Sequence, residues 1–311
     1  PRGAHNQMTY VIDGMPISDQ LTGAFANAVD PTIVQNIELF TGDVPAEYGN
    51  KVSGVANITT RTGMGTGRKA AGSTQLYAAG FDTLAQITQV QGGTEKFGYF
   101  ASVNTLKSNR FLDSVSLDNL HNGGNSERAF TRFDYQPNAR DTFRLNLMGG
   151  RSSFQLANLR SQHANGQQQR QLLRDASVSL GWVRTIDARS TFDATASYRT
   201  SIAQLFPSAG DTPVSASQAR HLSTLTLSAR YNRVAGIHNI RMGADLQRVP
   251  ISEFFSFAIT HPDFNHPDSD EFLPGLLPHD LSRGGSFFQF ADKRTGALDT
   301  GFLQDRIRLG R

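Results

Sequence analysis

A two-residue rhythm of apolar and polar side chains constrains the fold of this chain more than any other feature. In ASVSLGWV, small polar residues alternate with four apolar ones: Ala176, Val178, Leu180 and Trp182. Three further segments alternate in the same way: FDATASYR at 192–199, LTLSARY at 225–231 and IRMGADL at 240–246. Because successive side chains of a strand point to opposite faces, this period indicates strands with one apolar and one polar face.

The length of these segments distinguishes a membrane barrel from a soluble sandwich, which would show the same alternation. Segments such as 173–185, 190–204 and 219–233 reach or exceed the roughly 9–11 residues of a tilted membrane-spanning strand. Strands of soluble proteins are typically about 5–6 residues long. The lengths therefore favour a β-barrel that crosses a membrane.

The connections between these segments alternate between short and long. Short turns are predicted at 92–95, 137–141, 186–189, 234–236 and 294–297. Long polar loops are predicted at 107–126, 154–171, 205–218 and 250–283. Short turns on one side and long loops on the other are typical of outer-membrane barrels. The fold class is therefore predicted as an all-β membrane barrel, here about twelve antiparallel strands of a larger barrel, with a small α/β domain at the N-terminus.

The alternation also predicts which side chains face lipid. A charge on the lipid face costs about 2–4 kcal/mol at mid-bilayer, so four charged residues are expected to point into the bore: Arg144, Arg230, Arg241 and Asp245. Three apolar residues are expected to face lipid: Phe192, Leu225 and Ile240. The last predicted strand, near 298–309, has no closing partner. Unpaired backbone groups are costly in lipid, so further strands are expected to follow.

Composition narrows the alternatives. No run of eighteen apolar residues occurs, which excludes a transmembrane helix and a signal peptide but not a barrel. The chain has no cysteine, which excludes disulfides and thiolate chemistry. Its net charge is only +3, with arginines scattered along the chain, so a nucleic-acid partner is not expected.

A Gly-rich stretch, TGMGTGRKAAG at 62–72, separates two styles of sequence and marks a domain boundary with a flexible linker. Before it, Asp13-Gly14 predicts a tight hairpin turn, because glycine accepts a positive φ. Asp30-Pro31 predicts the N-cap and first turn of a short helix that leads into NIELF at 36–40. VANITTR at 55–61 predicts a further strand.

Two motifs in this first region, YVIDGMPISD at 10–19 and VDPTIVQNIELFTGDVPAEYGNKVSGVANITTRTG at 29–63, resemble the second half of the plug domain of TonB-dependent outer-membrane receptors. The resemblance implies a small α/β plug inside the barrel. It divides the chain into the C-terminal part of a plug at 1–63, a linker at 64–72 and the N-terminal part of the barrel at 73–311. The residues matching the plug motif are Asp13, Gly14, Glu38, Gly42, Tyr48, Gly49, Gly54 and Asn57.

What the resemblance implies is an integral protein of the bacterial outer membrane that takes up a scarce solute. Its partners would be membrane lipid, an unknown ligand and TonB, which would grip a segment ahead of Pro1. No cofactor is implied. Thr41-Gly42-Asp43 and Ser53-Gly54 depart from the usual family pattern, and with NRFLD at 109–113 they are similar to the Oar-like branch.

Other functions are compatible with parts of the same pattern. The same barrel could serve as a structural or adhesive surface protein, and a passive porin is disfavoured because a plug would obstruct flow. No Ser-His-Asp spacing or other catalytic constellation occurs, so an enzyme is not expected. Asp43 and Glu47 are interpreted as structural, and the aromatic residues of the apolar faces as a lipid-facing belt.

One metal-binding alternative remains in the longest loop. The segment HPDFNHPD carries His261, Asp263 and His266, whose side chains are common metal ligands. A solvated external loop is the favoured interpretation of this Pro-rich segment.

Overall fold

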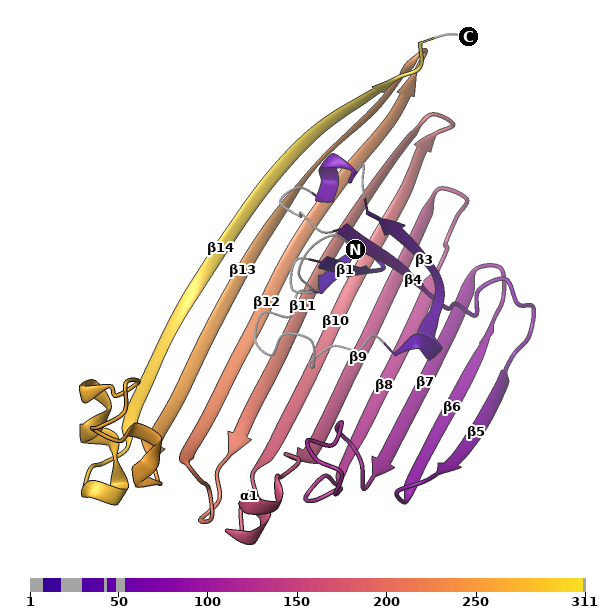
Figure 1. Ribbon diagram of the computed structural model, residues 1–311. Coiled ribbons are helices and arrows are strands. Elements are labelled where there is room, and N and C mark those ends of the chain that lie inside the picture. The colour runs from indigo at the N-terminus through magenta and orange to yellow at the C-terminus, as the bar shows by residue number, and fades with distance from the viewer. Residues whose placement is uncertain (1–7, 18–29, 42–43, 49–53, 310–311) are drawn as a thin grey trace.

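Two β-sheets make up the chain (Figure 1). The computed structural model describes residues 8–17, 30–41, 44–48 and 54–309. A large sheet of ten strands is formed by the second part of the chain, and a small sheet of four strands lies against one of its faces. In the described part, no helix is long and apolar enough to cross a membrane. The predicted fold class, mainly β with a small N-terminal domain, is confirmed.

The large sheet is an antiparallel meander in which every strand pairs with its neighbours in the sequence. Its strands are β5 (Ala71–Ala79), β6 (Thr83–Gly93), β7 (Phe97–Ser108), β8 (Gly124–Tyr135), β9 (Asp141–Gln155), β10 (Arg170–Asp187), β11 (Ser190–Phe206), β12 (Val214–Ala235), β13 (His238–Ile259) and β14 (Phe288–Ile307). Short turns join the strands at one end. At the other end the longer loops carry α1 (Arg160–Ala164), η5 (Pro262–Asn265), η6 (Pro274–His279) and η7 (Leu281–Arg283).

The strand count differs from the prediction, since the described part of the large sheet has ten strands rather than about twelve. The predicted turn at 294–297 is wrong, because Arg294 pairs with Ile251 and Ala297 with Arg248 in one unbroken β13–β14 ladder. The predicted loop at 250–283 starts only after Ile259. In this region the alternation of apolar and polar side chains becomes weak, but the backbone pairing of β13 and β14 continues. The observed strands are therefore longer and fewer than the predicted ones.

The large sheet has an inner face, which we define as the face in contact with the small sheet, and an outer face. Arg144 and Arg230 contact residues of the small domain, and Arg241 and Asp245 lie on the same face. The ladder places Phe192, Leu225 and Ile240 on the opposite face. The predicted alternation is therefore correct at all seven positions.

The outer face carries an apolar band bounded by polar residues. On β9, β10 and β13 the bounding residues are ten apart in sequence: Asp141 and Arg151, Arg184 and Arg174, and His238 and Arg248. Ten residues correspond to about 34 Å along a strand, and to about 25 Å of height at a tilt of about 40°. This height equals that of the apolar band of an outer-membrane barrel.

The small sheet consists of β1 (Met8–Ile12), β2 (Met15–Ile17), β3 (Val34–Phe40) and β4 (Gly54–Thr60) in the order β2-β1-β4-β3. The predicted hairpin turn is confirmed, with Asp13 at φ 48° and Gly14 at φ 86°. The predicted helix start is also confirmed, as a 3₁₀ helix η3 (Pro31–Ile33). The Asp30 carboxylate accepts a hydrogen bond from the Thr32 amide at 2.9 Å.

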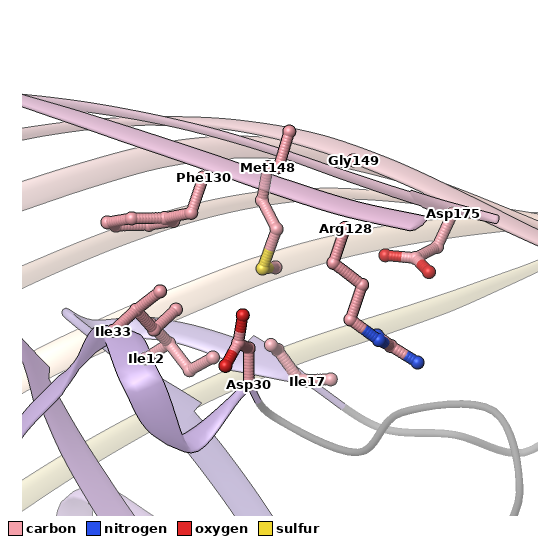
Figure 2. A pocket seen from close by; sticks show the side chains of 10 residues that line it. Ile12, Ile17, Asp30, Ile33, Arg128, Phe130, Met148, Gly149 and Asp175 are labelled. Atoms are coloured by element: carbon pink, nitrogen blue, oxygen red, sulfur yellow. The ribbon is translucent and has the colours of Figure 1, made fainter. Parts of the chain in front are cut away.

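An apolar core joins the small sheet to the large one. Ile12, Met15, Ile17 and Ile58 form its first part, and Ile33 continues it onto Phe100 and Phe130 of the inner face. Figure 2 shows Ile12, Ile17 and Ile33 opposite Phe130 and Met148 across a narrow cavity of about 30 Å³. This apolar patch of the inner face thus contributes to fixing where the small sheet sits.

The Gly-rich linker is fixed in place, which corrects the expectation of a flexible segment. The Gly65 amide donates to the Thr94 carbonyl at 3.0 Å, and the Gly93 amide donates to the Arg68 carbonyl at 2.8 Å. The Tyr99 hydroxyl donates to the carbonyl of Lys69 at 2.9 Å. The linker is therefore hydrogen-bonded along the β6–β7 turn, for which glycine composition allows close backbone approach.

A substitution at Gly98 tests this contact between the linker and the β6–β7 turn. A Cβ atom at this position would lie 2.2 Å from the backbone nitrogen of Met64, so either β7 or the linker must move. We expect G98A to lower the free energy of unfolding by about 1–3 kcal/mol, measured by urea titration. G80A is the control, because nothing lies within 4 Å of a Cβ atom there. Equal urea midpoints for the two variants would contradict this contact.

Candidate functional site

The candidate site is the interface between the small sheet and the inner face of the large sheet. A cavity of about 1260 Å³ lies there, lined from the small domain by β1 to β4 and η4 (Ala46–Tyr48) and from the large sheet by β9 to β14. Its lining includes the carboxylates of Glu38, Glu47, Asp193 and Asp245 and the guanidinium groups of Arg144, Arg230 and Arg241. The space is therefore polar and of mixed charge.

Asp13 forms the first polar attachment of the small sheet. Its side chain is 1% exposed. It accepts hydrogen bonds from the Thr60 amide at 3.1 Å, the Thr60 hydroxyl at 2.5 Å and Nδ2 of Asn146 at 2.8 Å. Arg132 Nη1 lies 3.5 Å from Asp13 Oδ1, and Arg144 donates to the Asp13 carbonyl.

Arg132 connects this attachment to the linker. Its Nη1 donates to the Thr60 carbonyl at 2.8 Å, and its Nε donates to Asp134 Oδ2 at 2.8 Å. Asp134 in turn accepts from the Thr62 hydroxyl at 2.5 Å. We call this network the Asp13 cluster: Asp13, Thr60, Thr62, Arg132, Asp134, Arg144 and Asn146. Its charges are buried and paired, so removing one of them leaves the partners without compensation.

Glu47 forms a second polar attachment, farther along the sheet. Its Oε1 accepts a hydrogen bond from Arg241 Nη1 at 3.1 Å, and its Oε2 lies 3.9 Å from Arg230 Nε. Arg230 also donates to Asp245 at 2.8 Å. Burial, followed by the nearby Glu47 carboxylate, raises the pKa of Tyr48 to about 12, so its phenol is neutral at physiological pH.

The arrangement of these groups supports attachment of the two sheets to each other. Within the described residues, the lining of the cavity contains no histidine, and its carboxylates Glu47 and Asp245 are engaged by arginines. Ion pairs between two packed sheets hold them in register, and water can replace such pairs when the sheets separate. The site is therefore a polar contact between the small sheet and the large sheet, and its charged groups can be hydrated again when the sheets separate.

The plug-motif residues of the sequence prediction are distributed over this interface and its rim. Asp13 and Gly14 face the inner face, where a Cβ atom on Gly14 would lie 3.1 Å from the Thr195 hydroxyl. Glu38 accepts a hydrogen bond from Asn57 at 3.2 Å. Gly54 has φ +142° and passes the Phe40 carbonyl closely. Gly42 and Gly49 lie outside the described residues.

The described side chains of the HPDFNHPD segment do not form a cluster of metal ligands. His261 Nδ1 lies 3.9 Å from Asp263, and His266 Nδ1 lies 3.7 Å from Asp268, with all four side chains about half exposed or more. Among the residues that the structure describes, no group of three or more His, Cys, Asp or Glu side chains is arranged to hold a metal ion. The segment forms η5 in the β13–β14 loop, at the opposite end of the large sheet from its short turns.

Sequence reasoning missed most members of the Asp13 cluster. Arg132, Asp134 and Asn146 occupy polar-face positions, and their neighbours Phe133 and Tyr135 point outward. Two charged residues and an amide at polar-face positions of the adjacent strands β8 and β9 were a signal in the sequence. Its meaning depends on the partner Asp13, which is 119 residues away from Arg132.

Comparison with known proteins supports the fold. No protein-family model and no curated protein matches the sequence. Among solved structures, the ferric citrate transporter FecA superposes with a TM-score of 0.64 at 16% identity, over 98% of this chain and 46% of that chain. The siderophore receptor PirA from Pseudomonas aeruginosa has a TM-score of 0.57 at 15% identity, over 98% of this chain and 52% of that chain.

The copper transporter OprC gives a TM-score of 0.62 at 10% identity, over 98% of this chain and 53% of that chain. The chain thus spans about half the length of the solved structures that it matches. Across nearly its whole length, it has the fold of part of a TonB-dependent outer-membrane receptor, with a small sheet set against the barrel wall.

Proposed function

We propose that this chain is part of a TonB-dependent transporter of the bacterial outer membrane, energised for the uptake of a scarce solute. The observation that carries the proposal is the small sheet held on the inner face by the Asp13 cluster and by Glu47. In this proposal residues 1–63 belong to the plug, 64–72 to the linker and 73–311 to the barrel. The apolar band of about 25 Å on the outer face supports the membrane location.

The polar attachments suit a plug that must move. Separating an apolar interface exposes its area to water at about 25 cal/mol per Å², whereas separated ion pairs recover hydration. The outer membrane has no nucleotide supply, so the energy would be delivered as a pull by TonB on a segment ahead of the small sheet. This pull would have to break the inner-face contacts of Asp13 and Glu47 and the apolar contact of Ile33 with Phe100 and Phe130.

The cavity supports a hydrophilic cargo. Its mixed carboxylates and arginines offer both acceptors and donors, which suits a polar chelate, an oligosaccharide or a peptide. The similar structures include transporters of ferric citrate and copper and a siderophore receptor. The sequence resemblance at Thr41-Gly42-Asp43 and Ser53-Gly54 supports a place in the Oar-like branch.

Uptake measurements test the proposal. A strain that lacks the full-length gene is grown on a panel of scarce iron chelates, vitamins, glycans and peptides, and the complementing nutrient is then supplied in labelled form. We expect uptake to stop when a protonophore collapses the proton-motive force or when TonB is deleted. Uptake that survives both treatments would contradict active transport. Loss of adhesion, with no nutrient phenotype, would favour a structural or adhesive barrel.

A further inference from the structure

The outer face of the large sheet carries a groove that the proposed transport function does not use. It has a volume of about 490 Å³ and crosses β8 to β12. Aromatic rings form one side of it, where Phe143 and Trp182 stack with centroids 6.3 Å apart and planes inclined by 6°. Ala194 and Ala196 of β11 lie beside Trp182 and Leu180, and Leu227 of β12 follows. The groove lies inside the apolar band.

Positive charge gathers at the short-turn end of this groove. Arg184 follows Trp182 by two residues on the same face and pairs across the ladder with Phe192. Arg233 pairs with Ser190 on the other side of β11, so the two arginines flank this strand. Both side chains are exposed. An anion that approached this end of the groove would meet both guanidinium groups.

The charge of the surrounding rim is also positive. The rim segments 136–141, 184–190 and 231–235 contain four arginines (Arg140, Arg184, Arg189 and Arg233) and two carboxylates (Asp141 and Asp187), a balance of +2. Arg184 Nη1 lies 3.4 Å from the Asp141 carboxylate, which also accepts from Trp182 Nε1 at 3.1 Å, and the rim keeps its excess of positive charge beside this pair. The rim can therefore accommodate an additional negative group.

We propose that this groove is a binding site for an anionic phospholipid of the leaflet on the short-turn side. One acyl chain lies against Trp182, Leu180 and Ala196, and the phosphate lies between Arg184 and Arg233. The proposal rests on the membrane location proposed above. Hydrocarbon is the medium that an apolar band of this height faces, and the cations at the band edge select a negative headgroup over a neutral one.

Trp182 provides a direct reporter, because it is the only tryptophan of the chain and lines the groove. The full-length protein is reconstituted in phosphatidylcholine vesicles that contain a small fraction of either dibrominated phosphatidylglycerol or dibrominated phosphatidylcholine. Subtraction of the W182F signal isolates quenching at Trp182. We expect phosphatidylglycerol to associate about fivefold more strongly, the effect of about one arginine near an anionic headgroup.

Matched variants separate the site from ordinary lipid contact. R184Q/R233Q is expected to abolish the preference, whereas R174Q should retain it, because Arg174 lies on the same face of β10 at the other edge of the band. A194L/A196L should fill the groove and lower quenching by brominated phosphatidylglycerol while both arginines remain.

Three outcomes would overturn the proposal. Equal quenching by the two brominated lipids would mean that the groove holds only unselected boundary lipid. An equal loss of preference in R174Q and R184Q/R233Q would mean that overall charge, rather than this site, attracts the lipid. No quenching by either lipid would place Trp182 outside hydrocarbon and would overturn the proposed membrane location as well, whereas the first two outcomes leave transport untouched.

Discussion

A disulfide between η3 and β7 is expected to reduce uptake to background. Thr32 of the small domain and Ser102 of the inner face have their hydroxyl oxygens 3.3 Å apart, and the chain has no cysteine of its own. In T32C/S102C, oxidation would tie the small sheet to the barrel wall by a covalent bond that a pull on the plug cannot separate. The measurements are a count of free thiols and the rate of labelled-cargo uptake before and after oxidation.

The control for this experiment is a disulfide between two neighbouring strands of the large sheet, which transport does not require to separate. Ser217 and Ser256 pair directly in the β12–β13 ladder, with hydroxyls 2.9 Å apart. Oxidised S217C/S256C should transport at the rate of its reduced form, and a reductant should restore uptake to T32C/S102C. Full uptake by oxidised T32C/S102C would show that cargo passes without separation of the small sheet from β7.

Replacement of Asp13 is expected to have the largest effect on stability. Asp13 is buried against Arg132, Arg144 and Asn146, so D13A leaves Arg144 without its carboxylate partner and leaves Arg132 with Asp134 alone. Breaking a buried ion pair in this way typically costs about 3–5 kcal/mol. The loss should appear as faster hydrogen exchange at the amides of β1 and β4 and as a lower urea midpoint of the small sheet.

Two further variants separate charge from backbone geometry. Asparagine tolerates the positive φ of this turn, so D13N keeps the hairpin and removes only the charge; we expect a smaller loss than for D13A. E38A removes an exposed carboxylate of the same small sheet and should change stability by no more than about 0.5 kcal/mol. A D13A protein as stable as E38A would contradict the assigned role of the Asp13 cluster.

Local features of this chain were predictable because their causes are local. The alternation in 192–199 and 225–231 reports which face of a strand is apolar, and the ladder reproduces it. The Asp13-Gly14 turn and the Asp30 cap depend on backbone geometry within a few residues. Such signals do not require knowledge of a distant partner.

The features that could not be predicted from the sequence depend on contacts between distant residues. Gly296 suggested a turn in RTGA, but the segment is held straight by pairing with Val249 of β13. The Gly-rich linker suggested freedom, but a Cβ atom at Gly63 would lie 2.2 Å from the Tyr99 carbonyl, so this glycine allows backbone contact at the β6–β7 turn. The parallel pairing of β1 with β4 and the Asp13 cluster bring together residues 46 to 133 positions apart.

The length of β12 and β13 has a consequence for how the protein meets its surroundings. Each has 22 residues, and in the proposed membrane orientation the part between Val214 and Ser223 would extend about 25 Å past the hydrocarbon at a barrel tilt of about 40°. There polar pairs occupy both faces of the sheet: Arg220 with Glu253 at 2.8 Å on the inner face, and Ser217 with Ser256 at 2.9 Å on the outer face. In the proposed membrane orientation, the loop tips thus lie on rigid paired strands beyond the bilayer, and their sequence can vary without altering the segment that the bilayer would embed.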